Sequence, residues 1–162
     1  MGVVKDKNGI WVSENKNGIS YPEIGNKDSF DLENSSFWFN HRNNIIEKVI
    51  KKIPFENDFA DIGGGNGYQL MRIAKNNTSN KNILIEPGYD GCLNARSRKL
   101  NDVYNMTFED FNFDQFIIGG VSMFDVIEHI EDDVTFMKRL AEKLKPGNKV
   151  YLTVPTHNYL WS

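Results

Sequence analysis

The stretch that decides the fold reads Asp-Phe-Ala-Asp-Ile-Gly-Gly-Gly-Asn-Gly-Tyr and occupies residues 58–68. Residues 58–62 have the pattern of a short apolar strand, and glycine then dominates residues 63–67. Glycine lets the chain turn sharply and lets a ligand approach the backbone. From Tyr68 onward, apolar side chains recur at helical spacing. The stretch therefore predicts a strand, a glycine-rich turn and a helix.

Strands and helices alternate along the rest of the chain. Alternation of this kind is typical of a parallel sheet with helices on both faces. We predict an α/β fold with a doubly wound, mostly parallel sheet, in which ligands bind beyond the carboxyl ends of the strands. Further strands are predicted at residues 83–85, 103–108, 116–124 and 149–154, and further helices at residues 37–53, 89–100 and 132–144.

The first 36 residues have a different character. They are polar and rich in turn-forming dipeptides such as Asn8-Gly9 and Asn17-Gly18. Residues 10–12 and 19–21 flank one of these turns, and their apolar side chains predict a small hairpin. We interpret residues 1–36 as an extension or lid outside the core, and residues 37–162 as the main domain.

Length and composition narrow the function classes. The chain has 162 residues and a formal net charge of −3, which fits a single globular domain. Lys and Arg form no block, so the sequence gives no support for nucleic-acid binding. The longest apolar stretch, residues 116–124, is too short to span a membrane, and we expect no membrane partner. Cys92 is the only cysteine and no secretory signal is evident, so we expect a cytoplasmic protein.

The charge around the glycine turn indicates what it binds. The dinucleotide-binding fingerprint requires glycine or alanine at the position of Tyr68, so this sequence does not meet it. Asp61 stands just before the turn, where its charge repels a pyrophosphate and attracts a cation. The turn therefore favours a nucleoside whose tail carries an ammonium or sulfonium group. The alternative is a tight turn that binds no ligand.

The pattern Asp-x-Gly-x-Gly-x-Gly at residues 61–67 resembles the first motif of the class I S-adenosylmethionine-dependent methyltransferases. The resemblance covers about residues 37–160 and implies a Rossmann-like fold. That fold usually has two more strands than the five predicted here, so we expect the last two to be lacking and the domain to be truncated at its C-terminus. In this family the loop backbone surrounds the methionyl part of the cofactor, and the acidic residue helps to hold its ammonium group. The resemblance implies cofactor contacts at Asp61, Gly63, Gly64, Gly65 and Gly67.

Acidic residues also follow the next two strands. Glu86 ends the second strand, where a carboxylate can accept hydrogen bonds from both ribose hydroxyls; the alternative is a solvated surface acid. Pro87, beside it, belongs to the same expected contact region. After the third strand, the resemblance implies that Asp110 binds the adenine amino group and that Phe111 covers the ring. Glu109 is an alternative to Asp110, and a surface loop over a buried Phe111 is the other interpretation.

The segment after the fourth strand resembles a motif of many small-molecule methyltransferases of this class. The resemblance implies that Met123 and Phe124 line the cofactor. His129 is the first candidate for a general base, although a structural histidine fits the sequence equally well. His157, after the fifth strand, is the second candidate. No spacing in the sequence matches a metal site, so we assign no metal.

We therefore expect an enzyme that moves the methyl group of S-adenosylmethionine to a small-molecule acceptor by in-line displacement and releases S-adenosylhomocysteine. The positive sulfur already activates the methyl group, so the main task of the protein is to align donor and acceptor and to exclude water. The alternatives are an NAD(P)-dependent oxidoreductase on the same architecture and a non-catalytic S-adenosylmethionine-binding module. The sequence leaves the acceptor and the oligomeric state undetermined.

Overall fold

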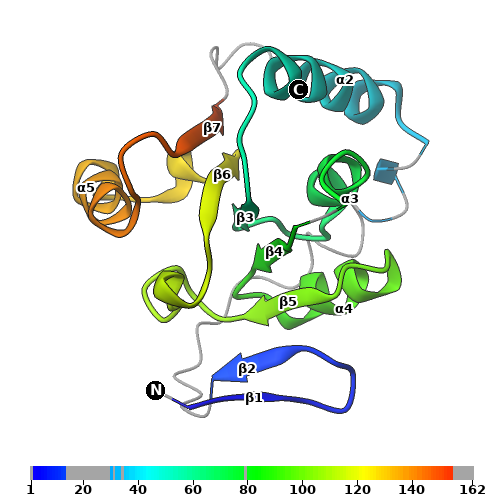
Figure 1. Cartoon of the computed structure of the whole chain (residues 1–162). Coiled ribbons are helices and arrows are strands. Elements are labelled where there is room, and N and C mark those ends of the chain that lie inside the picture. Colours follow the sequence, from blue (N-terminus) through cyan, green and yellow to red (C-terminus); the bar gives the residue numbers. More distant parts are fainter. Residues whose placement is uncertain (1, 14–29, 31, 34, 79, 155–162) are drawn as a thin grey trace.

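A seven-stranded sheet forms the centre of the described part of the chain (Figure 1). The computed structural model describes residues 2–13, 30, 32–33, 35–78 and 80–154. The strands follow the order β1-β2-β5-β4-β3-β6-β7, and all neighbours run parallel except β1 and β2. Their bounds are Val3–Lys5 (β1), Trp11–Ser13 (β2), Asp58–Ile62 (β3), Asn82–Ile85 (β4), Asp102–Asn105 (β5), Ile118–Phe124 (β6) and Lys149–Thr153 (β7).

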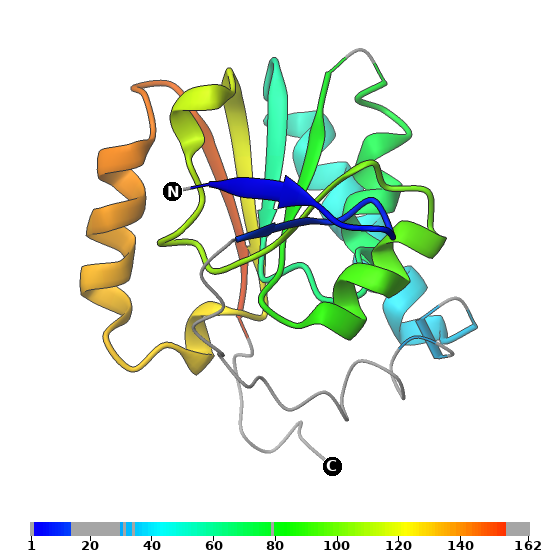
Figure 2. The same cartoon turned by 90° about the horizontal axis from the view of Figure 1, so that it is seen from below.

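Helices cover both faces of this sheet (Figures 1 and 2). Helices α2 (Phe37–Lys52), α3 (Tyr68–Ala74) and α4 (Tyr89–Ser97) pack on one face, and α5 (Asp133–Lys143) packs on the other. The arrangement confirms the predicted α/β fold with a doubly wound, mostly parallel, Rossmann-like sheet. Within the described ranges, no helix combines the length and the apolar character that crossing a membrane requires.

The order of the strands determines where a ligand can bind. From β3 the chain moves outward to β4 and β5, and it then returns across the sheet to β6 and β7 on the other side of β3. The connections that leave β3 and β6 therefore diverge at the carboxyl ends of these two strands. In doubly wound sheets such a divergence opens a crevice that holds ligands.

The hydrophobic core lies on both faces of the central strands. Successive side chains of a strand point to opposite faces, so Phe59 belongs to the buried cluster under α2, α3 and α4, whereas Ala60 belongs to the cluster under α5. Leu70 and Leu140 contribute fully buried side chains from the helices on the two faces. This packing fixes the strands, and with them the loops at their carboxyl ends.

The first thirteen residues contain a hairpin that differs from the expected one. β1 and β2 pair antiparallel across a turn that contains Asn8-Gly9. The Asp6 carboxylate stabilises this turn by accepting hydrogen bonds from the backbone N–H groups of Asn8 (2.9 Å) and Ile10 (2.8 Å). The expected pairing of residues 10–12 with residues 19–21 is therefore wrong for β2, and residues 19–21 lie outside the described residues.

This hairpin extends the sheet. β2 pairs parallel with β5, and the Trp11 ring stacks on Tyr104 with 5.9 Å between the ring centroids. Ile10 is fully buried in the core. Residues 3–13 thus form an added sheet edge, which corrects the expectation that residues 1–36 all lie outside the core. The physical reason is that β5 offers an unpaired edge, which the hairpin covers.

Candidate cofactor site

The loop between β3 and α3 packs its backbone tightly against two neighbours. Gly63, Gly65 and Gly67 have positive φ angles of 65°, 52° and 70°, which residues with side chains rarely adopt. A Cβ atom on Gly63 would lie 2.8 Å from Cγ2 of Val126, and one on Gly67 would lie 2.6 Å from Cδ1 of Leu100. Conformation and space therefore both require glycine, as the sequence pattern predicted.

Asp61 lies beneath this loop. It is 1% exposed, and its Oδ1 accepts a hydrogen bond of 2.7 Å from the Ser122 hydroxyl. Its Oδ2 is buried and has no hydrogen-bond partner in the described part of the chain. Burial, reinforced by the negative charge of Glu86, raises the pKa of Asp61 to about 7, although the Ser122 hydrogen bond and the charge of Arg42 act in the opposite direction. The Ser122 hydrogen bond and the charge of Arg42 thus offset only part of the cost of burying ionised Asp61.

Glu86 follows β4 and is bound to the glycine loop. Its Oε2 accepts a hydrogen bond of 2.8 Å from the Gly65 N–H, and its Oε1 accepts one of 2.6 Å from the Gly88 N–H. Burial raises the pKa of Glu86, and these two backbone donors oppose that rise. Two backbone amides therefore hold the Glu86 carboxylate in place, and one of them belongs to the glycine loop.

A cavity of about 360 Å³ opens at the carboxyl ends of β3, β4 and β6. It brings together six of the residues that the sequence analysis named: Gly63, Gly65, Glu86, Pro87, His129 and the alternative acid Glu109. The other expected contacts do not line it: Asp61, Gly64, Gly67, Asp110, Phe111, Met123 and Phe124. His157 lies outside the described residues.

The cavity wall after β5 lies earlier in the chain than expected. Thr107, Phe108 and Glu109 line the cavity, whereas Asp110 is exposed and its carboxylate accepts a hydrogen bond of 3.1 Å from the Thr107 hydroxyl. Phe111 is 2% exposed and packs in the core. The reason is that β5 ends at residue 105 instead of residue 108, so the chain turns over the cavity sooner.

Phe111 belongs to an aromatic cluster instead of the cavity. Its ring stacks on Phe116 with 5.4 Å between the centroids, and its edge contacts Tyr104 and Phe113. Aromatic pairs of this kind stabilise a core beyond the area that they bury. The side chain that the resemblance placed against adenine thus has a structural position, and Phe108 is the aromatic residue of this loop that reaches the cavity.

The loop after β6 forms the opposite wall. Met123 and Phe124 are buried, and because they are adjacent in a strand they belong to the clusters on opposite faces of the sheet. Neither reaches the cavity, whereas Asp125 and Val126 do. His129 ends a short 3₁₀ helix (Ile127–His129) and lines the cavity with them.

Two residues that are not among the predicted site residues, Arg42 and Thr153, fix this wall. Arg42, on α2, forms an ion pair of 2.6 Å with Oδ2 of Asp125 and donates a hydrogen bond of 2.9 Å to the hydroxyl of Thr153, on β7. The Thr153 hydroxyl in turn donates to Oδ1 of Asp125 (2.8 Å). Asp125 has a φ angle of 56°, which is unusual for a residue with a side chain. This Arg42–Asp125–Thr153 cluster holds Asp125 in its strained conformation.

The charges around the cavity suit a cation. Three carboxylates line it, from Glu86, Glu109 and Asp125, and no Lys or Arg among the described residues does. In a partly buried site such a set attracts a positive ligand and repels a pyrophosphate. Among the described residues, the cavity lining included, no group of three or more His, Cys, Asp or Glu side chains is arranged to hold a metal ion.

Sequence comparison identifies the family to which this site belongs. A family model for a methyltransferase domain matches residues 39–161. The chain belongs to this methyltransferase family. The match agrees with the class I S-adenosylmethionine-dependent pattern at residues 61–67, in a family that uses S-adenosylmethionine as its methyl donor. No curated protein matches the sequence of this chain.

Solved structures share the fold of this methyltransferase. The plantazolicin methyltransferase BpumL in complex with SAH is 15% identical with a TM-score of 0.63, over 82% of this chain and 53% of that one. A putative S-adenosyl-L-methionine-dependent methyltransferase from Methanococcus maripaludis is 18% identical with a TM-score of 0.63, over 88% and 68%. The PH0226 protein from Pyrococcus horikoshii OT3 is 17% identical with a TM-score of 0.64, over 87% and 65%. The chain spans about half the length of BpumL.

Proposed function

We propose that this methyltransferase transfers the methyl group of S-adenosylmethionine to a small-molecule acceptor, and that the cavity at the ends of β3, β4 and β6 holds the methyl donor. The observation that carries the proposal is the acidic cavity beside a glycine loop whose Gly65 amide is bound to Glu86. The tail of a sulfonium nucleoside carries positive charge, whereas the pyrophosphate of a dinucleotide is negative, so the acidic cavity lining favours the sulfonium nucleoside.

Different residues of the cavity lining would hold different parts of the cofactor. Glu86 retains acceptor capacity beyond its two amide bonds, because a carboxylate has about four lone-pair sites, and it would hold the ribose hydroxyls. The backbone at Gly63 and Gly65 would hold the methionyl part. Phe108 and Glu109 would hold the adenine: Glu109 is the predicted alternative to Asp110, and Phe108 takes the role expected of Phe111.

Asp61 would act from beneath the loop. Its unpartnered Oδ2 and its raised pKa indicate a carboxylate that gains from a nearby cation. Because Asp61 is 1% exposed and does not line the cavity, we propose that it stabilises the ammonium group of the cofactor electrostatically or through a water molecule.

The residues of the chain then have three tasks during transfer. When bound, the cofactor supplies a methyl group activated by its positive sulfur for in-line displacement. The two loop walls orient the donor and exclude water, and the Arg42–Asp125–Thr153 cluster fixes the wall on the acceptor side. His129 would accept the proton of a hydroxyl acceptor, since it lines the cavity. His157 stays the second candidate for this base.

A small-molecule acceptor and a cytoplasmic location complete the proposal. The net charge of −3 and the acidic cavity favour a small molecule over a nucleic acid, whose phosphates they repel. BpumL, which shares the fold, was crystallised with SAH and with desmethylPZN analogs. The single cysteine, Cys92, is buried and forms no disulfide, and its thiol donates to the Glu86 carbonyl oxygen at 3.3 Å, which suits a reducing compartment.

Ligand-dependent thermal stability tests the proposal. S-adenosylhomocysteine should raise the melting temperature, since a ligand that binds only the folded state stabilises it, and NAD should not. Glu86→Ala should abolish most of the effect of S-adenosylhomocysteine. Turnover of the methyl donor with candidate acceptors then tests catalysis. Stabilisation by NAD alone would show that the cavity belongs to an oxidoreductase.

A further inference from the structure

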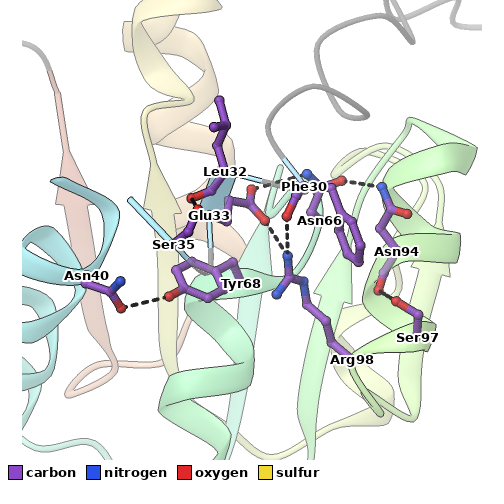
Figure 3. A network of polar contacts seen from close by, with 10 residues as sticks. All are labelled: Phe30, Leu32, Glu33, Ser35, Asn40, Asn66, Tyr68, Asn94, Ser97 and Arg98. Atoms are coloured by element: carbon purple, nitrogen blue, oxygen red, sulfur yellow. Dashed lines mark hydrogen bonds and ion pairs between the residues drawn. The ribbon is translucent and has the colours of Figure 1, made fainter. Parts of the chain in front are cut away.

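A buried ion pair of Glu33 and Arg98 lies beside Asn66 of the glycine loop (Figure 3), and neither residue of the pair lines the cavity. Glu33 precedes α2, and Arg98 is the C-cap of α4. The Arg98 Nη2 lies 2.6 Å from Oε2 of Glu33, and the two side chains are only 5% and 8% exposed. Burial raises the pKa of Glu33 and lowers that of Arg98, so the solvent contributes little to holding either charge.

Aromatic rings flank the guanidinium group of Arg98 (Figure 3). Its Cζ lies 4.4 Å from the ring centroid of Phe30 and 4.9 Å from that of Tyr68. Tyr68 is the first residue of α3, and its hydroxyl donates a hydrogen bond of 3.0 Å to Oδ1 of Asn40, on α2. The ion pair therefore joins the segment at residues 30–33 to three helices.

Asn66 connects this network to the cofactor loop. It is 3% exposed; its Nδ2 donates a hydrogen bond of 3.2 Å to Oε1 of Glu33, and its Oδ1 accepts one of 2.8 Å from Nδ2 of Asn94. Asn66 follows Gly65, whose N–H is bound to Glu86 and whose backbone lines the cavity. Hydrogen bonds to Glu33 and Asn94 thus hold the Asn66 side chain from both sides, and Asn66 is itself a residue of the glycine loop.

We propose that Glu33 and Arg98 are positioning residues for the methyl donor: through Asn66 they hold the Gly65 backbone in the geometry that the cofactor requires. The inference rests on the proposed function, because it assigns the cofactor to the loop at residues 63–67. Both carboxylate oxygens of Glu33 are committed, one to Arg98 and one to Asn66. Loss of either bond weakens the hold of Glu33 on the Asn66 side chain and lets the loop leave its binding conformation.

Glu33→Gln tests the proposal directly, because both carboxylate oxygens of Glu33 accept a hydrogen bond. Glutamine has the same shape but only one acceptor oxygen, so its NH₂ group must face a donor, either Nη2 of Arg98 or Nδ2 of Asn66. Residues that act on a site without touching its ligand typically change affinity by roughly two- to thirtyfold. We expect the Kd of S-adenosylhomocysteine, measured by calorimetry, to rise within this range.

A matched control separates positioning from stability. Glu47→Gln removes the same charge from the ion pair between Arg72 on α3 and Glu47 on α2, which are 2.5 Å apart and do not line the cavity. Both variants should lower the melting temperature, but only Glu33→Gln should raise the Kd and the KM for the methyl donor, with the KM for the acceptor unchanged. Equal Kd values for both variants and the wild type would overturn the proposal.

Asn66→Ala keeps the proposal testable even if Glu33→Gln does not fold, since it cuts the link and leaves the ion pair intact. Asn66→Ala should raise the Kd, and Glu33→Gln should add nothing in that background, because the two changes act on one network. An unchanged Kd in Asn66→Ala would show that the ion pair serves stability alone, and fully additive effects would show that Glu33 does not act through Asn66; either result would overturn the proposal. Wild-type protein that binds no S-adenosylhomocysteine would instead refute the proposed function.

Discussion

Replacement of Asp61 by asparagine is expected to stabilise the cofactor-free methyltransferase while weakening its cofactor binding. Burial raises the pKa of Asp61 from 3.8 to about 7. Since one pKa unit corresponds to about 1.4 kcal/mol, ionising Asp61 costs the folded protein roughly 4 kcal/mol that the unfolded chain does not bear. Asparagine has nearly the same shape, and its oxygen can still accept the hydrogen bond from Ser122.

The sign of the pH dependence follows from the raised pKa. Between the two pKa values the folded protein binds a proton that the unfolded chain has already lost, so the unfolding free energy falls as the pH rises. Of the roughly 4 kcal/mol, about 2 kcal/mol should be lost between about pH 5 and pH 7. Asp61→Asn lacks this titration. Urea denaturation of both proteins across this range measures the difference in unfolding free energy.

Cofactor binding gives a second measurement on the same residue. A cation near Asp61 favours its ionised form, so binding of S-adenosylhomocysteine to the wild type should release a proton below about pH 7. The variant should bind more weakly and release no such proton. Calorimetry in buffers of different ionisation enthalpy measures this release. The reasoning is refuted if the unfolding free energies of the two proteins change in parallel with pH.

Four further substitutions test the site. Glu86→Ala should weaken S-adenosylhomocysteine binding by about 1–3 kcal/mol in calorimetry, the usual loss for a charged hydrogen-bond partner; unchanged affinity would remove Glu86 from the site. Phe111→Ala should lower the unfolding free energy in urea by about 3–5 kcal/mol as a core deletion, with little change in the Kd of the folded protein. Arg42→Ala should raise the acceptor KM in steady-state kinetics, because Asp125 loses its ion pair; a KM equal to that of the wild type would contradict this. His129→Gln should lower kcat by about 10²–10⁴-fold if the acceptor is a hydroxyl, with an unchanged Kd for S-adenosylhomocysteine; an unchanged kcat would identify a structural histidine.

The parts of the site that the sequence predicted are those determined by neighbouring residues. Positive φ angles at Gly63 and Gly65 and the position of Glu86 at a strand end depend on local chemistry, and both lie in the predicted places. For the adenine side the sequence named Asp110 and Phe111, with Glu109 as the alternative acid, whereas Phe108 and Glu109 line the cavity. The end of β5 depends on packing against the rest of the sheet, and apolar residues up to Phe108 concealed it.

Contacts between distant segments had no signal in the sequence. Arg42 and Thr153 are 111 positions apart, and Arg98 and Glu33 are 65 positions apart, so no local pattern could pair them. The prediction of the hairpin was wrong for a related reason. Asn8-Gly9 and Asn17-Gly18 are equivalent as local turns, and the choice of partner for β2 was made by β1 on one side and β5 on the other.

The pairing of β2 with β5 has a consequence for folding during translation. Residues 3–13 leave the ribosome well before their partner strand at residues 102–105, so this edge of the sheet cannot form until β5 has been synthesised. Until then the side chains of Ile10 and Trp11 stay exposed to the nascent chain and to chaperones. Closing such a large loop is slow, so residues 3–13 are among the last to reach their native position.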